Sequence, residues 1–444
     1  MSAPSTLPFG PFEAATYRKI GRRLMPYLFL CYLLAYVNRV NVSFAKLQMQ
    51  ADLRMSDTVY GAGAGIFFIG YFFFEIPANM ILQKLGARLW LGSIMMAWGV
   101  VSICTMFVKG AFSFYALRLL LGVVESGFFP GVILYLTFWY TRKHRAKMVA
   151  AFMSAIPVSS VVASPISGWI LKHMAGLGHL ASWQWLFLTN GIPSVLMGMI
   201  TFLYLPDSPL KSAWLNQEEK DLVASRLDEE EEVKKQAGGG KHQIGYVFRS
   251  PRVWLFCLIY FGIVMGQYGL TFWLPQVIKE TLSADPQKIG WILVIPWGAA
   301  TVAMILAGRH SDITGERRWH IAGSVFVGGA AFAVSAIPGI SGAAGLAALT
   351  FAAMGIVCAN SLFWAMPTAV LSGAAAAAGI AWINSVGNLA GYVGPYVVGL
   401  IRDKTHSMFA ALLVLSAAAL TAALLTLYVM RKRPSTASAG AAAG

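Results

Sequence analysis

The chain alternates between long apolar segments and short polar connections. A helix that crosses the hydrocarbon core of a membrane needs about 20 mostly apolar residues, and twelve segments meet that requirement. They are residues 24–45, 58–82, 90–108, 111–137, 148–171, 183–205, 253–274, 289–308, 319–338, 344–370, 375–401 and 407–430. The pattern therefore predicts an all-α integral membrane protein with twelve transmembrane helices.

The twelve segments fall into two groups of six, separated by the most polar stretch of the chain. That stretch includes the acidic run from Asp228 to Glu232, which we interpret as part of a solvated, partly helical linker. Two bundles of six spans joined by a polar loop are typical of secondary transporters. The predicted organisation is an N-terminal tail (1–23), a first bundle (24–205), a linker (206–252), a second bundle (253–430) and a C-terminal tail (431–444).

Composition and charge support a membrane location. Hydrophobic residues make up 57% of the chain and charged residues only 12%, whereas roughly a quarter of the residues are charged in a soluble protein. The net charge of +15 is therefore a topology signal, and we expect no nucleic-acid partner. With the N-terminus in the cytoplasm, inside segments carry 24 Lys and Arg residues and outside loops carry 8. This bias predicts a multi-pass inner (plasma) membrane protein with both termini in the cytoplasm and the central linker there too.

Two arginines lie inside predicted spans, Arg39 in the first and Arg118 in the fourth. Holding a guanidinium in a bilayer costs a few kcal/mol or more, so such residues usually face a cavity on a transport pathway. Glu125 follows Arg118 by seven residues, close to two helical turns, and shares its face. Two fixed positive charges and one titratable carboxylate predict an anion site, with Glu125 as the proton-coupling residue. The alternative is an ion pair that only holds helices together.

Other polar and aromatic residues interrupt the apolar spans and are candidates for substrate binding. They are Tyr36, Tyr71, Gln267, Tyr268, Trp364, Asn384 and Asn388. For the amides, hydrogen bonding between helices is an equally good explanation. Glu75 in the second span is a candidate gate residue, in preference to a direct proton carrier. The spans contain no cluster of His, Asp or Cys that predicts catalysis, and we expect no metal and no cofactor.

The loops after the second and eighth spans carry related sequences. The first contains Lys84, Gly86 and Arg88, and the second reads Gly308-x-x-x-Asp312-x-x-Gly315-x-Arg317-Arg318. The second copy resembles the gating-loop signature of the major facilitator superfamily. The first copy is degenerate, because Gln83 stands where that superfamily usually has Asp.

More specific stretches resemble the anion:cation symporter family, in the branch of tartrate, phthalate and sugar-acid permeases. They are "LLAYVNRVNVSFAKLQM" at 33–49, "GAGIFFIGYFFFEIP" at 63–77, "LGVVESGFFPG" at 121–131, "WQWLF" at 183–187 and "YLPDSP" at 204–209. The resemblance implies a monomer with two bundles around a central cavity, which imports a small organic anion with protons. It also implies that Trp364 and Asn384 contact substrate.

Asn38 departs from the pattern of similar sugar-acid transporters, in which this position is often an Asp that takes part in proton coupling. The hypothesis from the sequence is therefore that Glu125 alone carries the coupling proton. The preferred substrate is a hydroxylated dicarboxylate such as tartrate, or a sugar acid. The alternatives are an aromatic carboxylate such as phthalate or a hydroxyphenyl acid, and exchange of anions or drugs by antiport.

Overall fold

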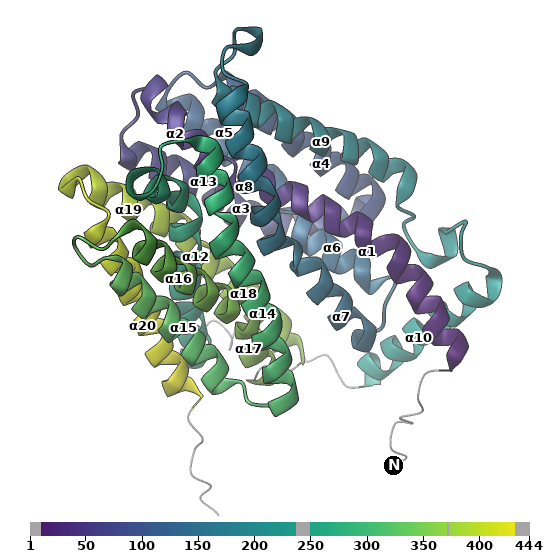
Figure 1. Ribbon diagram of the computed structural model, residues 1–444. Helices are drawn as coiled ribbons and strands as arrows, with labels where there is room; N and C mark the ends of the chain where they lie inside the picture. Colours follow the sequence, from purple (N-terminus) through teal and green to yellow (C-terminus); the bar gives the residue numbers. More distant parts are fainter. Residues whose placement is uncertain (1–9, 237–248, 371–372, 431–444) are drawn as a thin grey trace, which may run out of the picture.

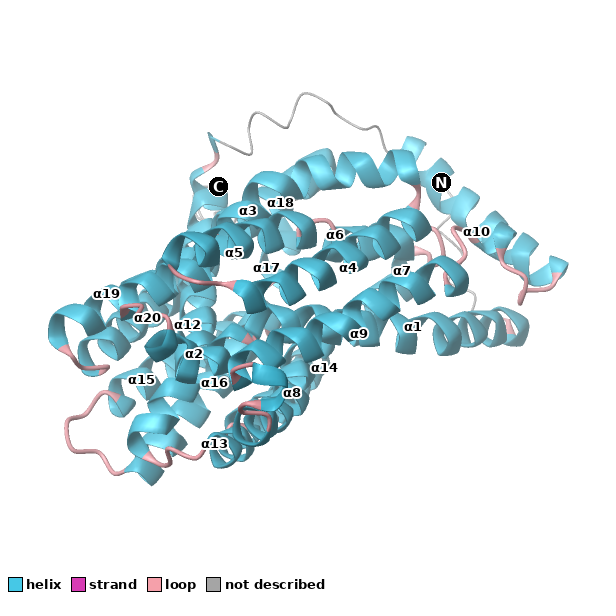
Figure 2. Ribbon diagram, turned by 90° about the horizontal axis from the view of Figure 1, so that it is seen from above, coloured by secondary structure: helices cyan, strands magenta, loops and turns pink. Residues whose placement is uncertain are grey.

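The computed structural model describes residues 10–236, 249–370 and 373–430. Within these ranges the chain forms only helices, turns and loops (Figure 2). The helices run roughly alongside one another, and α1 begins at the same end of the molecule at which α20 finishes (Figure 1).

The first half of the chain contributes α1 to α9. These helices are α1 (Pro11–Val40), α2 (Val42–Asp52), α3 (Asp57–Leu85), α4 (Ala87–Cys104), α5 (Ala111–Glu125), α6 (Phe128–Thr137), α7 (Arg142–Met153), α8 (Ala155–His173) and α9 (Ser182–Tyr204), with short 3-10 turns η1 (Thr105–Phe107) and η2 (Leu177–His179).

The second half contributes α12 to α20, and a separate helix lies between the halves. The second-half helices are α12 (Pro251–Thr281), α13 (Pro286–Ile292), α14 (Val294–Thr314), α15 (Arg318–Ser335), α16 (Gly342–Phe363), α17 (Ala365–Val370), α18 (Gly373–Asn388), α19 (Ala390–Thr405) and α20 (Phe409–Val429). The connecting segment holds the 3-10 turn η3 (Pro209–Lys211) and α10 (Gln217–Gln236), and α10 contains the acidic run.

The predicted architecture of twelve spans in two bundles is confirmed. In the described ranges, ten helical stretches are long and apolar enough to cross a membrane. The other two predicted spans correspond to α15, which is 18 residues long, and to the pair α18 and α19. Several spans are two helices in sequence, such as α1 and α2, which join at Asn41.

The first helix begins well before the predicted span, because its start packs against α10. Lys19 forms an ion pair with Glu219 at 2.7 Å, and Arg226 pairs with Glu13 at 3.0 Å. These contacts bring α10 and the start of α1 together at one end of the molecule. We call this end the α10 face and the opposite end, which carries α13, the α13 face.

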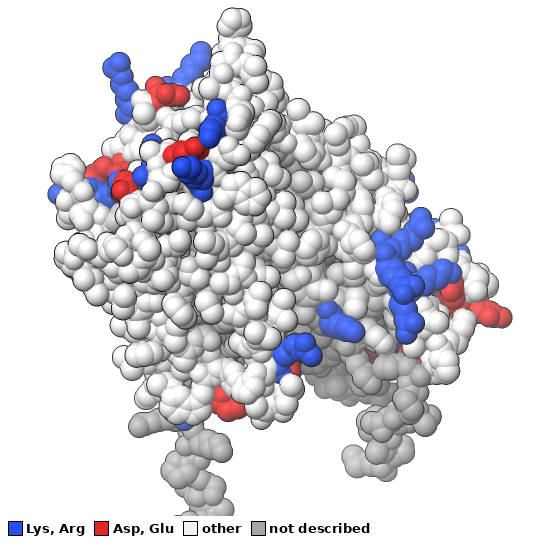
Figure 3. All heavy atoms as spheres, in the orientation of Figure 1, with Lys and Arg blue, Asp and Glu red and all other residues white. Residues whose placement is uncertain are grey.

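Charged side chains gather toward the two ends of the molecule. Figure 3 shows Lys, Arg, Asp and Glu mainly at the upper left of the view and along its right side and bottom, with a broad uncharged band between these groups. Exposed apolar residues such as Phe73, Ile76 and Leu203 belong to the spans. An uncharged apolar surface across helices of this length is typical of a protein that sits in lipid.

The two halves meet along α3 and the α18–α19 pair, which run antiparallel. A Cβ added at Gly61 would lie 2.3 Å from the carbonyl oxygen of Pro395, and one at Gly399 would lie 2.3 Å from that of Asp57. Only glycine therefore fits at these positions, and the backbones of the two halves are in direct contact. We call this contact line the seam.

Candidate functional site

The predicted pair Arg39 and Glu125 meets in the interior of the protein. Nε of Arg39 donates to Oε1 of Glu125 at 3.0 Å, and Nη2 donates to the same oxygen. The side chains are 9% and 1% exposed, so the ion pair is almost free of solvent. It joins α1 to the end of α5.

Aromatic rings surround the Arg39 guanidinium. Its Cζ lies 4.8 Å from the ring centre of Tyr36, 5.0 Å from that of Phe67 and 5.5 Å from that of Tyr71. Nη1 of Arg39 donates to the hydroxyl of Tyr268 at 3.3 Å, and this hydroxyl is 3.3 Å from the hydroxyl of Tyr36. Because Tyr268 comes from α12, the Arg39 cluster spans both halves.

Arg118 is buried but does not pair with Glu125. Its Nη2 donates to the carbonyl of Ala64 at 2.9 Å and to that of Arg39 at 3.5 Å, and its Nε donates to the carbonyl of Gly63 at 3.4 Å. Its Nη1 and Oε2 of Glu125 are buried without a hydrogen-bond partner among the described residues. Arg118 and Glu125 thus each keep one polar atom available for a ligand.

Asn38 points away from the Arg39 cluster, into the packing between α1, α4 and α9. Its Nδ2 donates to Ser194 at 2.8 Å and to the carbonyls of Leu34 and Asn190, and its Oδ1 accepts from Ser102 at 2.6 Å. Both amide atoms are in use, and a carboxylate at this position would lack the N–H donors that Asn38 gives to two carbonyls.

The candidates of the second half divide into separate groups. Gln267 accepts a hydrogen bond from Asn360, an amide that the sequence analysis missed. The ring of Trp364 lies edge-on to Tyr260, with centroids 4.8 Å apart. Asn388 shares a helix with Asn384, but no hydrogen bond to its side chain is found in the described ranges. Only Tyr268 joins the Arg39 cluster directly.

Glu75 and Asn384 meet across the seam. Oε1 of Glu75 accepts from Nδ2 of Asn384 at 3.2 Å, and Oε2 accepts from the hydroxyl of Ser385 at 3.5 Å. Glu75 lies 18 residues after the start of α3, or about 27 Å along the helix. The contact is therefore far from the α13 face.

The second loop motif is folded by its own side chains. Arg317 donates to Asp312 at 2.7 Å and to Ser311 at 3.0 Å, and Gly315 adopts a left-handed φ of +66°. Arg318 donates to the carbonyl of Leu427 at 3.0 Å. Gly308 has no neighbour within 4 Å of an added Cβ.

Glu316 stabilises the start of α15 beside this motif. Burial raises the pKa of its carboxyl, but hydrogen bonds from the backbone N–H of Trp319 and from His320 outweigh burial and leave the pKa lowered.

The first loop motif uses a residue from elsewhere in the chain. Gly86 has φ +82° at the junction of α3 and α4, and the backbone N–H of Arg88 donates to Oδ1 of Asp207 at 3.2 Å. Lys84 is exposed. Asp207 belongs to the "YLPDSP" stretch, and it supplies a carboxylate to a loop in which the sequence has Gln83.

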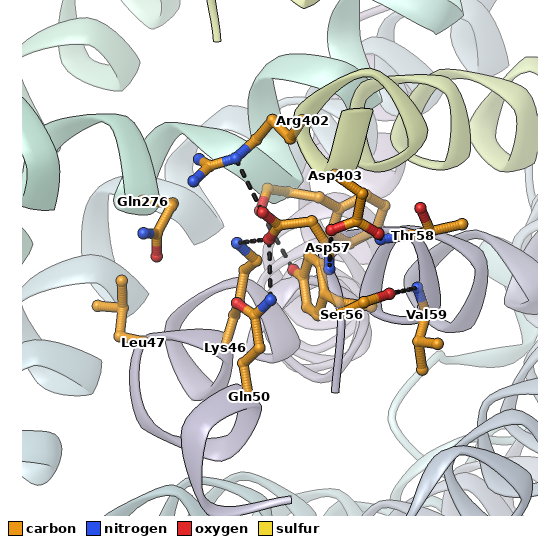
Figure 4. A network of polar contacts seen from close by, with 12 residues as sticks. Lys46, Leu47, Gln50, Ser56, Asp57, Thr58, Val59, Gln276, Arg402 and Asp403 are labelled. Carbon is orange, nitrogen blue, oxygen red and sulfur yellow. Dashed lines mark hydrogen bonds and ion pairs between the residues drawn. The ribbon is translucent and has the colours of Figure 1, made fainter. Parts of the chain in front are cut away.

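A polar network that the sequence analysis missed joins the halves at the α13 face (Figure 4). Oδ1 of Asp57 accepts from Lys46 and Gln50, each at 2.9 Å, and Oδ2 accepts from Arg402 of α19 at 3.0 Å. The carboxylate of Asp403 accepts the backbone N–H groups of Asp57 at 3.0 Å and Thr58 at 2.8 Å. We call this network the clasp.

The clasp combines charge with helix geometry. The Lys46 side chain is fully buried, and its Nζ lies 4.1 Å from the ring centre of Trp273 in the other half. Asp403 places its negative charge at the N-terminus of α3, where free N–H groups and the helix dipole favour an anion. Nearby, Lys172 of α8 and Asp285 also join the halves at 2.7 Å.

Comparisons with known proteins agree with this architecture. Residues 28–395 match the Major Facilitator Superfamily. The chain is 45% identical over 424 residues to an Agrobacterium vitis protein named "Putative tartrate transporter", covering 95% of this chain and 96% of that one. It is 40% identical over 423 residues to the "Quinolone resistance transporter" of Acinetobacter baumannii, covering 95% and 96%. The inward open structure of the xylose transporter XylE from E. coli has the same fold, with a TM-score of 0.71, 13% identity and coverage of 93% and 97%.

Proposed function

The chain belongs to the Major Facilitator Superfamily and is a transporter rather than an enzyme, and we propose that it imports a small organic anion together with protons. The observation that carries the proposal is the buried ion pair of Arg39 and Glu125. In this proposal the two bundles expose the Arg39 cluster to each side of the membrane in turn. Both termini are cytoplasmic, the membrane is the inner membrane, and the working unit is a monomer.

The ion pair supplies a mechanism for coupling. A substrate carboxylate competes with Glu125 for the Arg39 guanidinium, which can hold a carboxylate through two parallel hydrogen bonds. Glu125 is then a buried carboxylate without its Arg39 partner, and it takes up a proton that neutralises its charge. With Glu125 protonated, Arg39 and Arg118 give the site two positive charges, which match a dicarboxylate. By reciprocity, the bound dianion raises the affinity of Glu125 for its proton.

The preferred substrate is a hydroxylated dicarboxylate such as tartrate, or a sugar acid. The tyrosine hydroxyls around Arg39 and the amides of Gln267 and Asn360 can hydrogen-bond to hydroxyl groups. The name of the Agrobacterium vitis relative also supports this class.

A second candidate is an aromatic carboxylate. Three rings, those of Tyr36, Phe67 and Tyr71, lie around the Arg39 guanidinium and could stack on an aromatic acid. Antiport of anions or drugs is the further alternative, and the quinolone-resistance relative gives it a basis.

Uptake by purified protein in liposomes tests the proposal. With the interior alkaline, we expect tartrate to accumulate and the external medium to become alkaline as protons enter with it. Phthalate serves as the competitor that separates the two substrate classes. Antiport against protons would instead acidify the external medium when substrate is added there, and exchange against another anion would leave its pH unchanged.

Two variants test the roles of the charged pair. Glu125→Gln should strongly reduce accumulation driven by the pH gradient, because its side chain cannot exchange a proton. Arg39→Lys should lose most uptake, because an ammonium cannot form the paired hydrogen bonds of a guanidinium. Arg54→Lys, at an exposed position, is the matched control and should transport normally. Undiminished accumulation by Glu125→Gln would rule the coupling mechanism out.

A further inference from the structure

Glu75 is a carboxylate within a span whose hydrogen-bond partners are neutral. Asn384 and Ser385 of α18 donate to it across the seam, and in the described part of the chain it forms no ion pair. Glu125, by contrast, is paired with a guanidinium. The two intramembrane carboxylates of the first half therefore differ in what compensates their charge.

Within the described ranges, no Lys, Arg or His pairs with Glu75. Tyr71, one turn earlier on α3, and Tyr260 on α12 are titratable side chains that interact with it. Glu75 is partly buried, and burial of a carboxylate disfavours its charged form unless a cation or several donors compensate. Ionisable residues within membranes accordingly mark proton or substrate pathways, and at Glu75 the counter-charge that remains is a proton.

We propose that Glu75 is a second proton-binding residue of the transport cycle, and that its proton controls the contact between α3 and α18. The ionised carboxylate accepts hydrogen bonds from Asn384 and Ser385 and holds the halves together on the α10 side of the seam. A protonated Glu75 has one acceptor fewer and releases an N–H of Asn384. This inference rests on the proposed function, and it replaces two expectations from the sequence: that Glu125 alone carries a proton and that Glu75 is a gate in preference to a proton carrier.

The position of Glu75 explains how one proton can act on both substrate and conformation. Asn384 is a candidate substrate residue, so its amide is able to bind either Glu75 or a ligand. Position 38 on α1 holds an asparagine, which cannot titrate. In this proposal the second titratable carboxylate is Glu75 on α3. The expected stoichiometry is two protons for each tartrate dianion, which moves no net charge.

The charge moved in each cycle tests this directly. Wild-type protein in liposomes should take up tartrate at a rate independent of a potassium diffusion potential set with valinomycin. Glu75→Gln should move one proton fewer, so each cycle carries one negative charge inward and an interior-negative potential slows uptake. Glu75→Asp keeps a carboxylate and should behave like wild type, as should the control Glu218→Gln at an exposed position of α10.

Exchange of labelled tartrate at equal pH on both sides shows whether each variant is folded, because exchange needs no net proton movement. If Glu75→Gln exchanges tartrate but keeps the wild-type stoichiometry, the inference is wrong. If Glu75→Gln does not exchange, the decision comes from wild-type protein. The potential at which wild-type tartrate flux reverses, at a set pH gradient and a set tartrate gradient, then gives the number of protons per tartrate, and a value of one or fewer overturns the inference.

The same experiments separate this inference from the proposed function. Wild-type protein that fails to couple tartrate uptake to a proton gradient contradicts the proposed function. Coupled uptake with one proton per tartrate leaves the proposed function intact and refutes the role of Glu75.

Discussion

Asp403 should control how readily the α13 face opens. Its carboxylate belongs to the second half, yet it caps α3 in the first half by accepting the N–H groups of Asp57 and Thr58. Opening this face must break both hydrogen bonds. Asp403→Ala removes them from the closed state and leaves the open state almost unchanged, so the equilibrium should shift toward opening.

The size of the shift follows from capping energies. A side-chain cap at a helix N-terminus stabilises a protein by about 0.5–2 kcal/mol, and a negative charge there adds about 0.3–1 kcal/mol. Since Asp403 is partly exposed, we take a total of about 1–2 kcal/mol. That energy corresponds to a change of about 5- to 30-fold in the ratio of open to closed molecules.

Distances between spin labels measure this ratio. Labels on cysteines introduced at Ala51 of α2 and Lys404 of α19 report the separation of the halves, since both positions are exposed at the α13 face. The four native cysteines would be replaced by alanine. Asp403→Ala should raise the ratio of the long-distance to the short-distance population by the factor given above.

Ser341→Ala is the matched control for this measurement. Ser341 caps α16 by accepting the N–H of Ala344 at 3.3 Å, and both residues belong to the second half. Its removal should weaken α16 without opening the α13 face. Equal distance distributions in Asp403→Ala and wild type would refute the reasoning, and so would an equal shift in both variants.

Three further predictions concern packing, pH and the second arginine. Gly122→Ala should lower thermal stability by about 1–3 kcal/mol, because its Cβ would lie 1.9 Å from a carbonyl oxygen of α3, whereas Gly298→Ala, with open space around it, should not. Burial raises the pKa of Glu219, but hydrogen bonds from Lys19 and a backbone N–H outweigh burial and lower the pKa, so this carboxylate stabilises the fold above the pKa of the unfolded chain, near 4.3. The stability difference between wild type and Glu219→Gln in thermal unfolding should therefore be at most about 1 kcal/mol at pH 7 and vanish as the pH falls below about 4. Arg118→Lys should lose at least about tenfold in uptake per inserted molecule, equivalent to about 1.4 kcal/mol, because one ammonium cannot serve three backbone carbonyls and a ligand, and normal uptake would show that its role is only structural.

The sequence predicts the fold well because each span must satisfy the same physical demand. A segment in lipid has to be apolar and helical over its whole length, so hydropathy alone locates the spans. What it does not reveal is where a helix changes direction, as at Asn41, or that α1 begins at Pro11. The start of α1 depends on ion pairs with α10, which are contacts between segments about 200 residues apart.

The charged centre could be predicted in part. Rare charges in apolar spans point to Arg39, Arg118 and Glu125, and the structure brings Arg39 and Glu125 together. Shared helical phase suggested that Arg118 would lie near Glu125 as well, but its guanidinium is instead occupied by backbone carbonyls of α3. Close packing at Gly122 brings α3 within reach of these donors. Helical phase describes one helix, and it says nothing about which neighbour a long side chain contacts.

The clasp could not be found from the sequence. Asp57 and Arg402 are separated by 345 positions, and both lie near predicted span ends, where charges are ordinary. The signal that marks a buried arginine, its cost in lipid, is absent there. Only the three-dimensional arrangement shows that charges counted for topology also connect the two halves.

The glycines of the seam have a consequence for how the bundles move. Where large side chains interdigitate, one helix cannot rotate against another until rotamers change. At Gly61 and Gly399 the backbone of α3 packs directly against the backbone of α19, so the two helices can rotate against each other there without a change of side-chain rotamer. The clasp and the Glu75 contact lie toward opposite ends of this contact line, and both are formed in this structure, so opening either face must break the polar contact at that end. Breaking these polar contacts at the two ends would then be a main cost of moving one bundle against the other.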